Sequence, residues 1–121
     1  MHSLLFFDTY AFFEIIRGNP KYAKYKDTLA ITTLFNIAEL NYGLKKELSI
    51  DEADSLTRKY ESFVVDVTPA EILKAMTLKL KHRKFSIPDA IGYTIARKYD
   101  IPFLTGDEDF RNIPHVEFVK K

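Results

Sequence analysis

The stretch SIPDAIGYTIARKYDIPFLTGDEDF, residues 86–110, leads from a helix start through a buried strand into an acidic loop. Ser86 and Asp89 have the spacing of a capping box, in which each side chain accepts a hydrogen bond from the other residue's backbone N–H. The apolar spacing that follows predicts a helix over 88–99. Residues 101–104 are apolar throughout, which is typical of a strand buried on both faces of a parallel sheet. This stretch therefore predicts an α/β fold.

Three acids crowd the loop directly behind this strand. Asp107, Glu108 and Asp109 follow the apolar run, and no basic residue lies within residues 103–110 to offset their repulsion. In parallel sheets, ligands bind beyond the carboxyl ends of the strands. The loop therefore lies where a binding site is expected.

The rest of the chain repeats this alternation of helix and strand. Further strands are expected at residues 3–7, 29–31, 63–67 and 116–119. Helices are expected over 9–17, 33–48 and 49–61, from 68 into the basic run KLKHRK, and in a short segment near 20–26. Because the strands lack a polar face, the sequence predicts a mostly parallel sheet of four to five strands inside a three-layer α/β/α sandwich.

The apolar spacing of the helices predicts which side chains they bury. The expected core positions of the three longest helices are Leu34, Ile37, Leu40, Leu44 and Leu48, then Ile72, Leu73, Met76 and Leu80, and then Ile91, Ile95 and Tyr99. Gly92 and Ala96 lie on a face of small residues, which suits a close contact with a neighbouring element.

Length and composition limit the classes of protein. The chain has 121 residues, 46% of them hydrophobic, and a net charge of +1. The near-neutral net charge excludes a strongly basic surface of the kind that many nucleic-acid-binding proteins have. A nucleic-acid partner is neither required nor excluded by it. The absence of cysteine excludes disulfides and thiolate metal sites. No run approaches a membrane span, and MHSLLFF is too short for a signal peptide, so we expect one cytoplasmic domain over residues 1–121.

Four acids are expected to meet at one edge of this sheet. Asp8 directly follows the first strand, and Asp107 follows the fourth. Asp89 opens a helix that can face the same edge, and Glu39 lies in the helix after the second strand. Unpaired acids held together need a cation, and oxygen ligands alone favour Mg²⁺ or Mn²⁺. One or two such ions can activate a water for in-line attack on a phosphodiester.

Each of these acids also has an ordinary structural interpretation. Asp8 can cap a helix, and Asp89 can serve only its capping box. Glu39 can be an exposed helical Glu, the commonest place for that residue, although Tyr42 on the same face makes that face less polar than usual. The acids of loop 107–109 can simply start a short helix. Spacing alone leaves these alternatives open.

Four stretches together have the order and spacing of a known family. They are LLFFDTYAFFE at 4–14, TLFNIAELNYG at 33–43, SIPDAIGYTIARKYDIPFLT at 86–105 and GDEDF at 106–110. With these stretches, essentially the whole chain resembles PIN-domain ribonucleases, in particular the compact VapC-type toxins of toxin–antitoxin pairs. The resemblance implies an α/β/α sandwich with a parallel sheet. It also implies Mg²⁺- or Mn²⁺-dependent endonucleolytic cleavage of RNA.

The resemblance further implies roles for individual residues. The metal-binding acids of the family match, in chain order, Asp8, Glu39, Asp89 and Asp107. Asp109 matches the acid that closes the last motif, and we expect it to bind a second metal or to support the fourth acid. The small polar positions that orient a carboxylate or a water match Thr9 and Thr105, with a weaker match at Asn36.

The implied reaction needs no protein nucleophile. An activated hydroxide would attack phosphorus, and the 3′ oxygen would leave. His2, His82 and His115 lie outside the motifs, and we expect ordinary surface residues there. The resemblance also implies a homodimer and a cognate antitoxin whose tail inserts a basic side chain near the acids. The alternatives are a stand-alone PIN nuclease that processes RNA without an antitoxin, and a catalytically silent PIN-like binding module.

Basic and aromatic residues outside the motifs have two interpretations each. Lys81, Arg83 and Lys84 can hold RNA phosphates beside the acids, or they can form a solvated helix end whose cations favour the helix dipole. Tyr22 and Tyr25 lie among lysines, and they can stack on bases or cover a groove for a dimer partner or antitoxin.

Two other classes with a parallel sheet fit less well. A phosphoryl-transfer enzyme of the haloacid-dehalogenase kind needs a second Asp two residues after the strand-one Asp, where this chain has Tyr10. A receiver domain needs an acceptor Asp after a middle strand and a Lys after the last one. Here Asp66 lies inside its expected strand, and Arg111 is the base nearest the fourth strand. The sequence therefore favours a metal-dependent nuclease.

Overall fold

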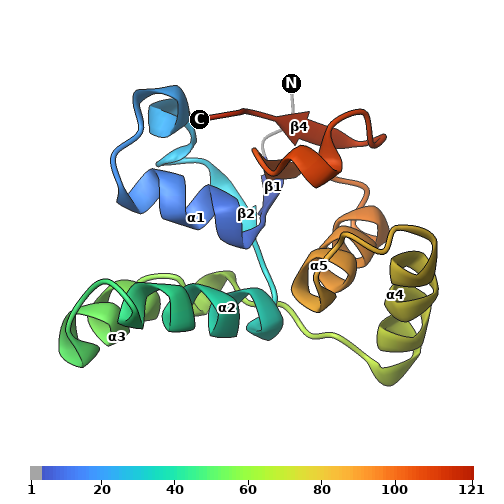
Figure 1. The fold of residues 1–121 in the computed structure, drawn as a ribbon, viewed down its shortest axis with the longest axis horizontal. Coiled ribbons are helices and arrows are strands. Elements are labelled where there is room, and N and C mark those ends of the chain that lie inside the picture. The colour runs from blue at the N-terminus through green and yellow to red at the C-terminus, as the bar shows by residue number, and fades with distance from the viewer. Residues whose placement is uncertain (1–3) are drawn as a thin grey trace.

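The structure is a computed structural model that describes residues 4–121 (Figure 1). Its four strands are β1 (Leu4–Phe7), β2 (Leu29–Ile31), β3 (Phe103–Thr105) and β4 (Val116–Phe118). They form one sheet in the order β2–β1–β3–β4, and every neighbouring pair is parallel. The expected parallel sheet of four to five strands is therefore confirmed, with four strands among the described residues.

In the described part of the chain, five α-helices and three short 3₁₀ helices connect and cover these strands. The α-helices are α1 (Thr9–Ile16), α2 (Leu34–Lys45), α3 (Ile50–Arg58), α4 (Pro69–Lys81) and α5 (Ile87–Lys98). The 3₁₀ helices are η1 (Pro20–Tyr25), η2 (Glu61–Phe63) and η3 (Glu108–Phe110). Each α-helix begins after an Asp, Thr or Ser whose side chain accepts a backbone N–H, as their sequences predict. No helix within residues 4–121 is long and apolar enough to cross a membrane.

The sheet separates two hydrophobic cores, which makes the fold a three-layer sandwich. Phe6 packs with α4, α5 and β3 on one face, and it stacks on Phe103 with ring centres 5.3 Å apart. Its neighbours Leu5 and Phe7 point to the opposite face, where α1, η1, α2 and α3 pack. Because successive side chains of a strand alternate between faces, the apolar run of β1 supplies both cores at once.

A glycine brings α5 close to the central strand. A Cβ added at Gly92 would lie 2.8 Å from the ring of Phe6, so a larger residue would force the helix away from β1. Gly92 and Ala96 are both buried, which confirms the close contact expected from their size. One turn earlier on the same helix lies Asp89. The packing of Gly92 therefore helps to fix the position of this acid.

The strand expected over residues 63–67 is wrong. Residues 61–63 form η2, and Val64 makes only an isolated parallel bridge to Thr32. The physical reason is that β2 is short and the chain turns into α2 directly after Thr32. The segment therefore meets a backbone partner at one residue only, with Thr32 N–H donating to Phe63 O and Val65 N–H donating to Thr32 O.

Several expected core residues of the helices are instead exposed. Leu73 and Leu80 point to solvent although Ile72, Ala75 and Met76 on the same helix pack against the core. Two apolar stripes run along α4, and as an outer helix that packs mainly on α5 it can bury only one of them. The same misassignment affects positions at the ends of their helices, namely Leu34, Leu48 and Tyr99.

Candidate active site

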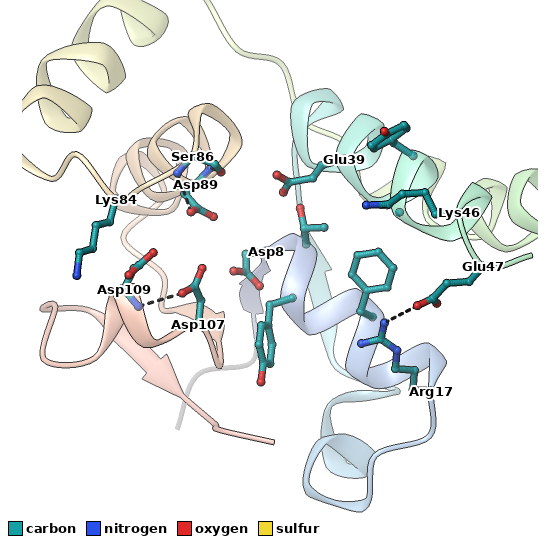
Figure 2. Close-up of a pocket in the computed structure, with 15 residues that line it drawn as sticks. Asp8, Arg17, Glu39, Lys46, Glu47, Lys84, Ser86, Asp89, Asp107 and Asp109 are labelled. Atoms are coloured by element: carbon teal, nitrogen blue, oxygen red, sulfur yellow. Dashed lines mark hydrogen bonds and ion pairs between the residues drawn. The ribbon is translucent and has the colours of Figure 1, made fainter.

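One open pocket of about 640 Å³ lies at the carboxyl ends of β1 and β3 (Figure 2). Its walls come from α1 and the residue after it, the second half of α2 and the residues after it, the start of α5 with the segment before it, and the loop that follows β3. All five acids expected from the sequence line it, namely Asp8, Glu39, Asp89, Asp107 and Asp109. The fold therefore brings carboxylates from four separate segments to one place.

Asp8 is the most deeply buried of these acids. It is only 1% exposed, and its Oδ1 accepts the Ala11 N–H at 2.9 Å, so it also caps α1. Burial raises the pKa of Asp8 well above its usual value, while the Thr105 hydroxyl and the Ala11 N–H lower it. The nearby charges of Asp89 and Asp107 raise this pKa further. An ionised Asp8 would therefore be stabilised by a cation in the pocket.

Asp89 combines its capping role with a place in the pocket. The Ser86 N–H donates to its Oδ2 at 2.9 Å, and the Asp89 N–H donates to Ser86 Oγ at 3.1 Å. Burial raises the pKa of Asp89 to about 6, the charges of Asp107 and Glu39 add to that effect, and the Ser86 N–H opposes it. Within residues 4–121 its Oδ1 makes no hydrogen bond. One oxygen therefore serves the helix, and the other is available to a ligand.

The acidic loop after β3 divides into site acids and a surface acid. Asp107 and Asp109 line the pocket, and Asp107 Oδ1 accepts the Asp109 N–H at 2.9 Å, which starts η3. Glu108 instead binds Arg111 with two hydrogen bonds of 2.8 Å and pairs with Lys120. The hydrogen bonds from Arg111 and then Lys120 lower the pKa of Glu108 to about 2. Repulsion in this loop is therefore relieved at Glu108 by bases, whereas the two aspartates face the pocket.

Glu39 reaches the same pocket from the opposite wall. It lies in the second turn of α2, and Figure 2 shows its carboxylate directed toward the space in front of Asp8 and Asp89. In the described part of the chain, this carboxylate makes neither a hydrogen bond nor an ion pair. Glu39 therefore lines the pocket with a carboxylate that has no partner among the described residues.

The expected small polar residues divide between the pocket and its support. Thr9 lines the pocket, whereas Asn36 is fully buried beneath it. Asn36 Nδ2 donates to Thr9 Oγ1 at 3.4 Å, and Asn36 Oδ1 accepts the Thr33 hydroxyl at 2.7 Å, so this amide joins the starts of α1 and α2. Thr105 is also buried, and its Oγ1 accepts the Asp107 N–H at 3.1 Å. These groups hold the acid-bearing segments in position.

The donor set of the pocket fits a hard divalent cation. All the acids offer oxygen ligands, and Asp8 and Asp89 are buried without a basic partner among residues 4–121. The same described residues contain no group of three or more Asp, Glu or His side chains arranged to hold a metal by themselves. Mg²⁺ usually keeps several waters and takes one or two carboxylates from the protein. A roomy pocket of this volume therefore fits a hydrated ion better than a closed cage.

The residues of the basic run KLKHRK, residues 79–84, differ in where they lie relative to the pocket. Lys84 lines the pocket near Asp109 (Figure 2), whereas Lys81 and Arg83 are exposed and do not line it. The run turns at the end of α4, where the Lys79 ammonium donates to the Phe85 carbonyl at 2.6 Å. Binding of RNA by Lys81 and Arg83 stays a prediction without support from the pocket geometry.

The two tyrosines are too buried to stack on bases, so that expectation is wrong, whereas a groove for a dimer partner or antitoxin at Tyr22, which lines a small cavity, stays a prediction. Tyr22 is fully buried, and its hydroxyl donates to Val119 O at 2.6 Å. Tyr25 is also buried and donates to the Glu117 carboxylate. Both rings belong to the core between α1 and β4. Of the three histidines, His82 and His115 are exposed as expected, and His2 lies outside the described residues.

The sequence reasoning missed several residues that extend the pocket along α1 and α2. These are Tyr10, Phe13, Arg17, Gly43, Lys46 and Glu47. A helical period counted from the acids would have found most of them. On α2, positions 39, 42, 43 and 46 lie on one face, and on α1 and its end, positions 9, 13 and 17 do. The signal for these residues is that they share a helix face with an acid of the pocket.

The fold and this pocket define a class: an α/β/α sandwich with a cluster of acids at the carboxyl ends of its parallel strands. The profile of the PIN domain family matches residues 5–116. The chain therefore belongs to the PIN domain family. This membership replaces the haloacid-dehalogenase and receiver-domain alternatives.

Solved structures with the same fold include toxin–antitoxin proteins. A toxin–antitoxin complex from Klebsiella pneumoniae aligns with a TM-score of 0.77 at 19% identity, over 97% of this chain and 99% of that one. VapBC2 from Rickettsia felis, bound to a DNA fragment from its promoter, aligns with a TM-score of 0.71 at 16% identity, over 97% and 98%. A protein from Pyrobaculum aerophilum aligns with a TM-score of 0.72 at 20% identity, over 98% and 92%. No curated protein sequence matches this chain.

Proposed function

We propose that residues 1–121 form a single-domain, cytoplasmic endoribonuclease that hydrolyses RNA phosphodiester bonds with Mg²⁺ or Mn²⁺. The observation that carries this proposal is the pair of buried acids Asp8 and Asp89, whose pKa values are raised and which face further acids across one pocket. Buried carboxylates without bases are costly unless a cation joins them. Membership of the PIN domain family supports the same activity.

Some groups of this pocket would bind the metal ion, and others would orient those ligands. In this proposal Asp8, Asp89 and Asp107 would bind the metal together with waters, Asp109 would be a further or second ligand, and Glu39 would face them across the pocket. When bound, a divalent ion supplies an activated water and stabilises charge on the phosphoryl oxygens. The Ser86 and Ala11 N–H groups fix one oxygen each of Asp89 and Asp8, which orients the remaining oxygens toward the pocket.

We further propose that this nuclease is the toxin of a toxin–antitoxin pair and forms a homodimer. Two structures with the same fold are complexes of toxin with antitoxin, and this supports a cognate antitoxin for the present chain. The alternatives are a stand-alone PIN nuclease without an antitoxin and a silent PIN-like binding module. The complete set of five pocket acids argues against the silent module.

The test is cleavage of a mixed pool of structured RNA by purified, antitoxin-free protein in Mg²⁺, Mn²⁺ or EDTA. The Asp8→Asn variant serves as the control, because Asn can still cap α1. We expect cleavage that depends on the metal and is lost in the variant. Cleavage that persists in EDTA would contradict the metal-dependent mechanism. Cleavage by a folded Asp8→Asn protein at the wild-type rate would remove Asp8 from the site.

A further inference from the structure

The pocket extends beyond the acids into the space between α1 and α2. This extension is lined by Phe13 and Arg17 on one side and by Tyr42, Gly43 and Lys46 on the other. A Cβ added at Gly43 would lie 2.3 Å from Cζ of Phe13, so glycine lets the two helices approach there. Each aromatic ring carries a cation over one face, with Arg17 4.9 Å from the ring centre of Phe13 and Lys46 5.0 Å from that of Tyr42.

The two cations of this extension differ in how their charge is compensated. Arg17 pairs with the buried Glu14 at 3.2 Å and with Glu47 at 3.4 Å. Lys46 forms no ion pair with any residue of 4–121. Its neighbour Lys45 pairs with Asp54 at 2.9 Å, away from the pocket. Arg17 therefore belongs to the framework of the groove, and Lys46 has a charge available for an anionic ligand.

A second uncompensated cation lies at the other end of the pocket. Lys84 also makes no ion pair within the described residues. Figure 2 shows Lys84 beyond Asp109 on one side and Lys46 beyond Glu39 on the other, with the acids between them. A polyanion that crosses an acidic pocket is repelled at its centre unless a cation binds there, and it gains most from positive charge on both flanks. The arrangement fits a strand whose phosphates reach both lysines.

Tyr42 adds a surface for a base beside Lys46. Its side chain is 68% exposed although it lines the pocket, and Lys46 covers one face of its ring. Exposed aromatic rings beside basic groups are the usual platform for single-stranded nucleic acids, because every base has a face that can stack. A double helix keeps its bases paired and stacked inside, so this platform suits a single strand.

We propose that Tyr42 and Lys46 form a subsite for the nucleotide next to the cleaved bond of a single-stranded RNA. Tyr42 stacks on the base, Lys46 binds the adjacent phosphate, and Lys84 binds a phosphate on the opposite side of the acids. This inference rests on the proposed ribonuclease activity and adds how the strand is held.

The test measures binding of a short, fluorescein-labelled single-stranded RNA of mixed sequence by anisotropy over a range of NaCl concentrations. All proteins keep the five pocket acids, and Ca²⁺ replaces Mg²⁺ so that a cation can occupy the pocket; gel electrophoresis after each titration verifies that the RNA is intact. Lys46→Ala and Lys84→Ala should each reduce the salt slope of log K by about 0.7, the value for one phosphate contact on a single strand. Lys45→Ala is the matched control, since it removes a neighbouring charge that faces Asp54, and it should leave the slope unchanged.

Substitutions at Tyr42 test the stacking part of the subsite. Tyr42→Ala should weaken binding about tenfold, whereas Tyr42→Phe, which keeps the ring, should retain it. Because the side chain is mostly exposed, both variants should fold, as circular dichroism and thermal unfolding can verify. In the active background, the same Tyr42→Ala change should raise KM more than it lowers kcat.

The outcomes separate the subsite from the activity itself. If wild-type protein cleaves RNA but Lys46→Ala and Tyr42→Ala bind like the Lys45→Ala control, the subsite is refuted and the ribonuclease activity stands. If the wild-type protein neither cleaves nor binds the RNA, both proposals fail. If Lys84→Ala alone changes the salt slope, the strand does not extend along α2 and the Tyr42–Lys46 subsite is refuted.

Discussion

The starts of α4 and α5 have the same local structure and opposite electrostatics. In α4, Thr68 N–H donates to Glu71 Oε1 at 2.8 Å, and Glu71 N–H donates to Thr68 Oγ1 at 3.2 Å. In α5, Ser86 and Asp89 exchange the corresponding bonds at 2.9 and 3.1 Å. Both are complete capping boxes with a proline in the first turn. As local motifs, the two helix starts are equivalent.

The surroundings of the two acids differ in charge and in burial. Glu71 pairs with Lys98 at 2.8 Å near the surface, and the Lys98 hydrogen bond lowers the pKa of Glu71. Asp89 is 8% exposed and faces other acids, and mainly burial raises its pKa to about 6. A capping box therefore fixes where a carboxylate is, but its neighbours in the fold decide whether it is easily ionised. That difference separates an acid that is neutralised at the surface from an acid that lines the pocket.

The largest effect that distinguishes the two boxes should be on cleavage. Asp89→Asn should reduce the rate of RNA cleavage in Mg²⁺ at least about a hundredfold, because an amide cannot hold the ion as a carboxylate does. Glu71→Gln should leave the rate within about twofold, since it touches no pocket residue. Initial rates on the same RNA pool, with enzyme purified in parallel, make the comparison. Equal losses in the two variants would mean that Asp89 acts through the helix alone.

Metal binding in the absence of RNA should also differ between the Asp89 and Glu71 variants. A ligand that binds only the folded state raises the free energy of unfolding by about 2.7 kcal/mol at a concentration one hundred times its Kd. Mn²⁺ should therefore raise the melting temperature of wild-type protein and of Glu71→Gln, and should have little effect on Asp89→Asn. Thermal unfolding with Mn²⁺ and with EDTA measures these shifts. An Asp89→Asn protein stabilised as strongly as wild type would place the ion elsewhere.

In the absence of metal, the two substitutions should change stability in opposite directions. The folded-state pKa of Asp89 is about 6 against an ordinary value of 3.8, so the folded state binds more protons between these pH values. The free energy of unfolding of wild type therefore falls as pH rises through this window and levels off above it.

At neutral pH, Asp89→Asn should accordingly raise the free energy of unfolding by roughly 3 kcal/mol, and this gain should vanish below pH 3.8. Glu71→Gln removes an ion pair at the surface and should lower stability slightly. Urea unfolding in EDTA at several pH values tests both. A loss of stability at neutral pH in Asp89→Asn would show that its capping role outweighs the cost of its burial.

The smallest expected effect is a loss of stability that should be the same for both capping boxes. Thr68→Ala and Ser86→Ala each remove the hydroxyl that accepts an N–H of the first turn, which costs about 1 kcal/mol of stability. Urea unfolding should give similar values for the two variants. A much larger loss for Ser86→Ala would indicate that this hydroxyl also supports the packing of the pocket.

Most of the fold was predictable because its signals are local. Cap residues predict the start of every α-helix, continuous apolar runs predict β1, β2 and β3, and a shorter run around Glu117 predicts β4. The failures occur where a local signal needs a partner that the fold does not provide. Residues 63–67 have strand composition but meet only one residue of the short β2, and the second apolar stripe of α4 has no neighbouring element to cover it.

The acids of the site were predictable because parallel strands bring their carboxyl ends to one edge. All five expected carboxylates line the pocket, and the two capping interpretations are also correct in geometry. The groove along α1 and α2 was only partly predictable: the helical period places Phe13, Tyr42 and Lys46 on the same faces as the acids, but only the close contact of the two helices at Gly43 brings those faces together. Likewise, the burial of Tyr22 depends on a carbonyl from the far end of the chain.

The sequence by itself determined the order of helices and strands, the caps and the identity of the acids, because these depend on hydrogen bonds and apolar spacing within a few residues. The tertiary structure alone decided which acids are buried together, which are neutralised by bases and which lysines remain unpaired. Glu108, between two pocket aspartates, pairs with Arg111 and Lys120, whereas Asp89 in its capping box faces Asp107 and Glu39. Charge and burial depend on distances across the fold, and those distances exist only once the chain is packed.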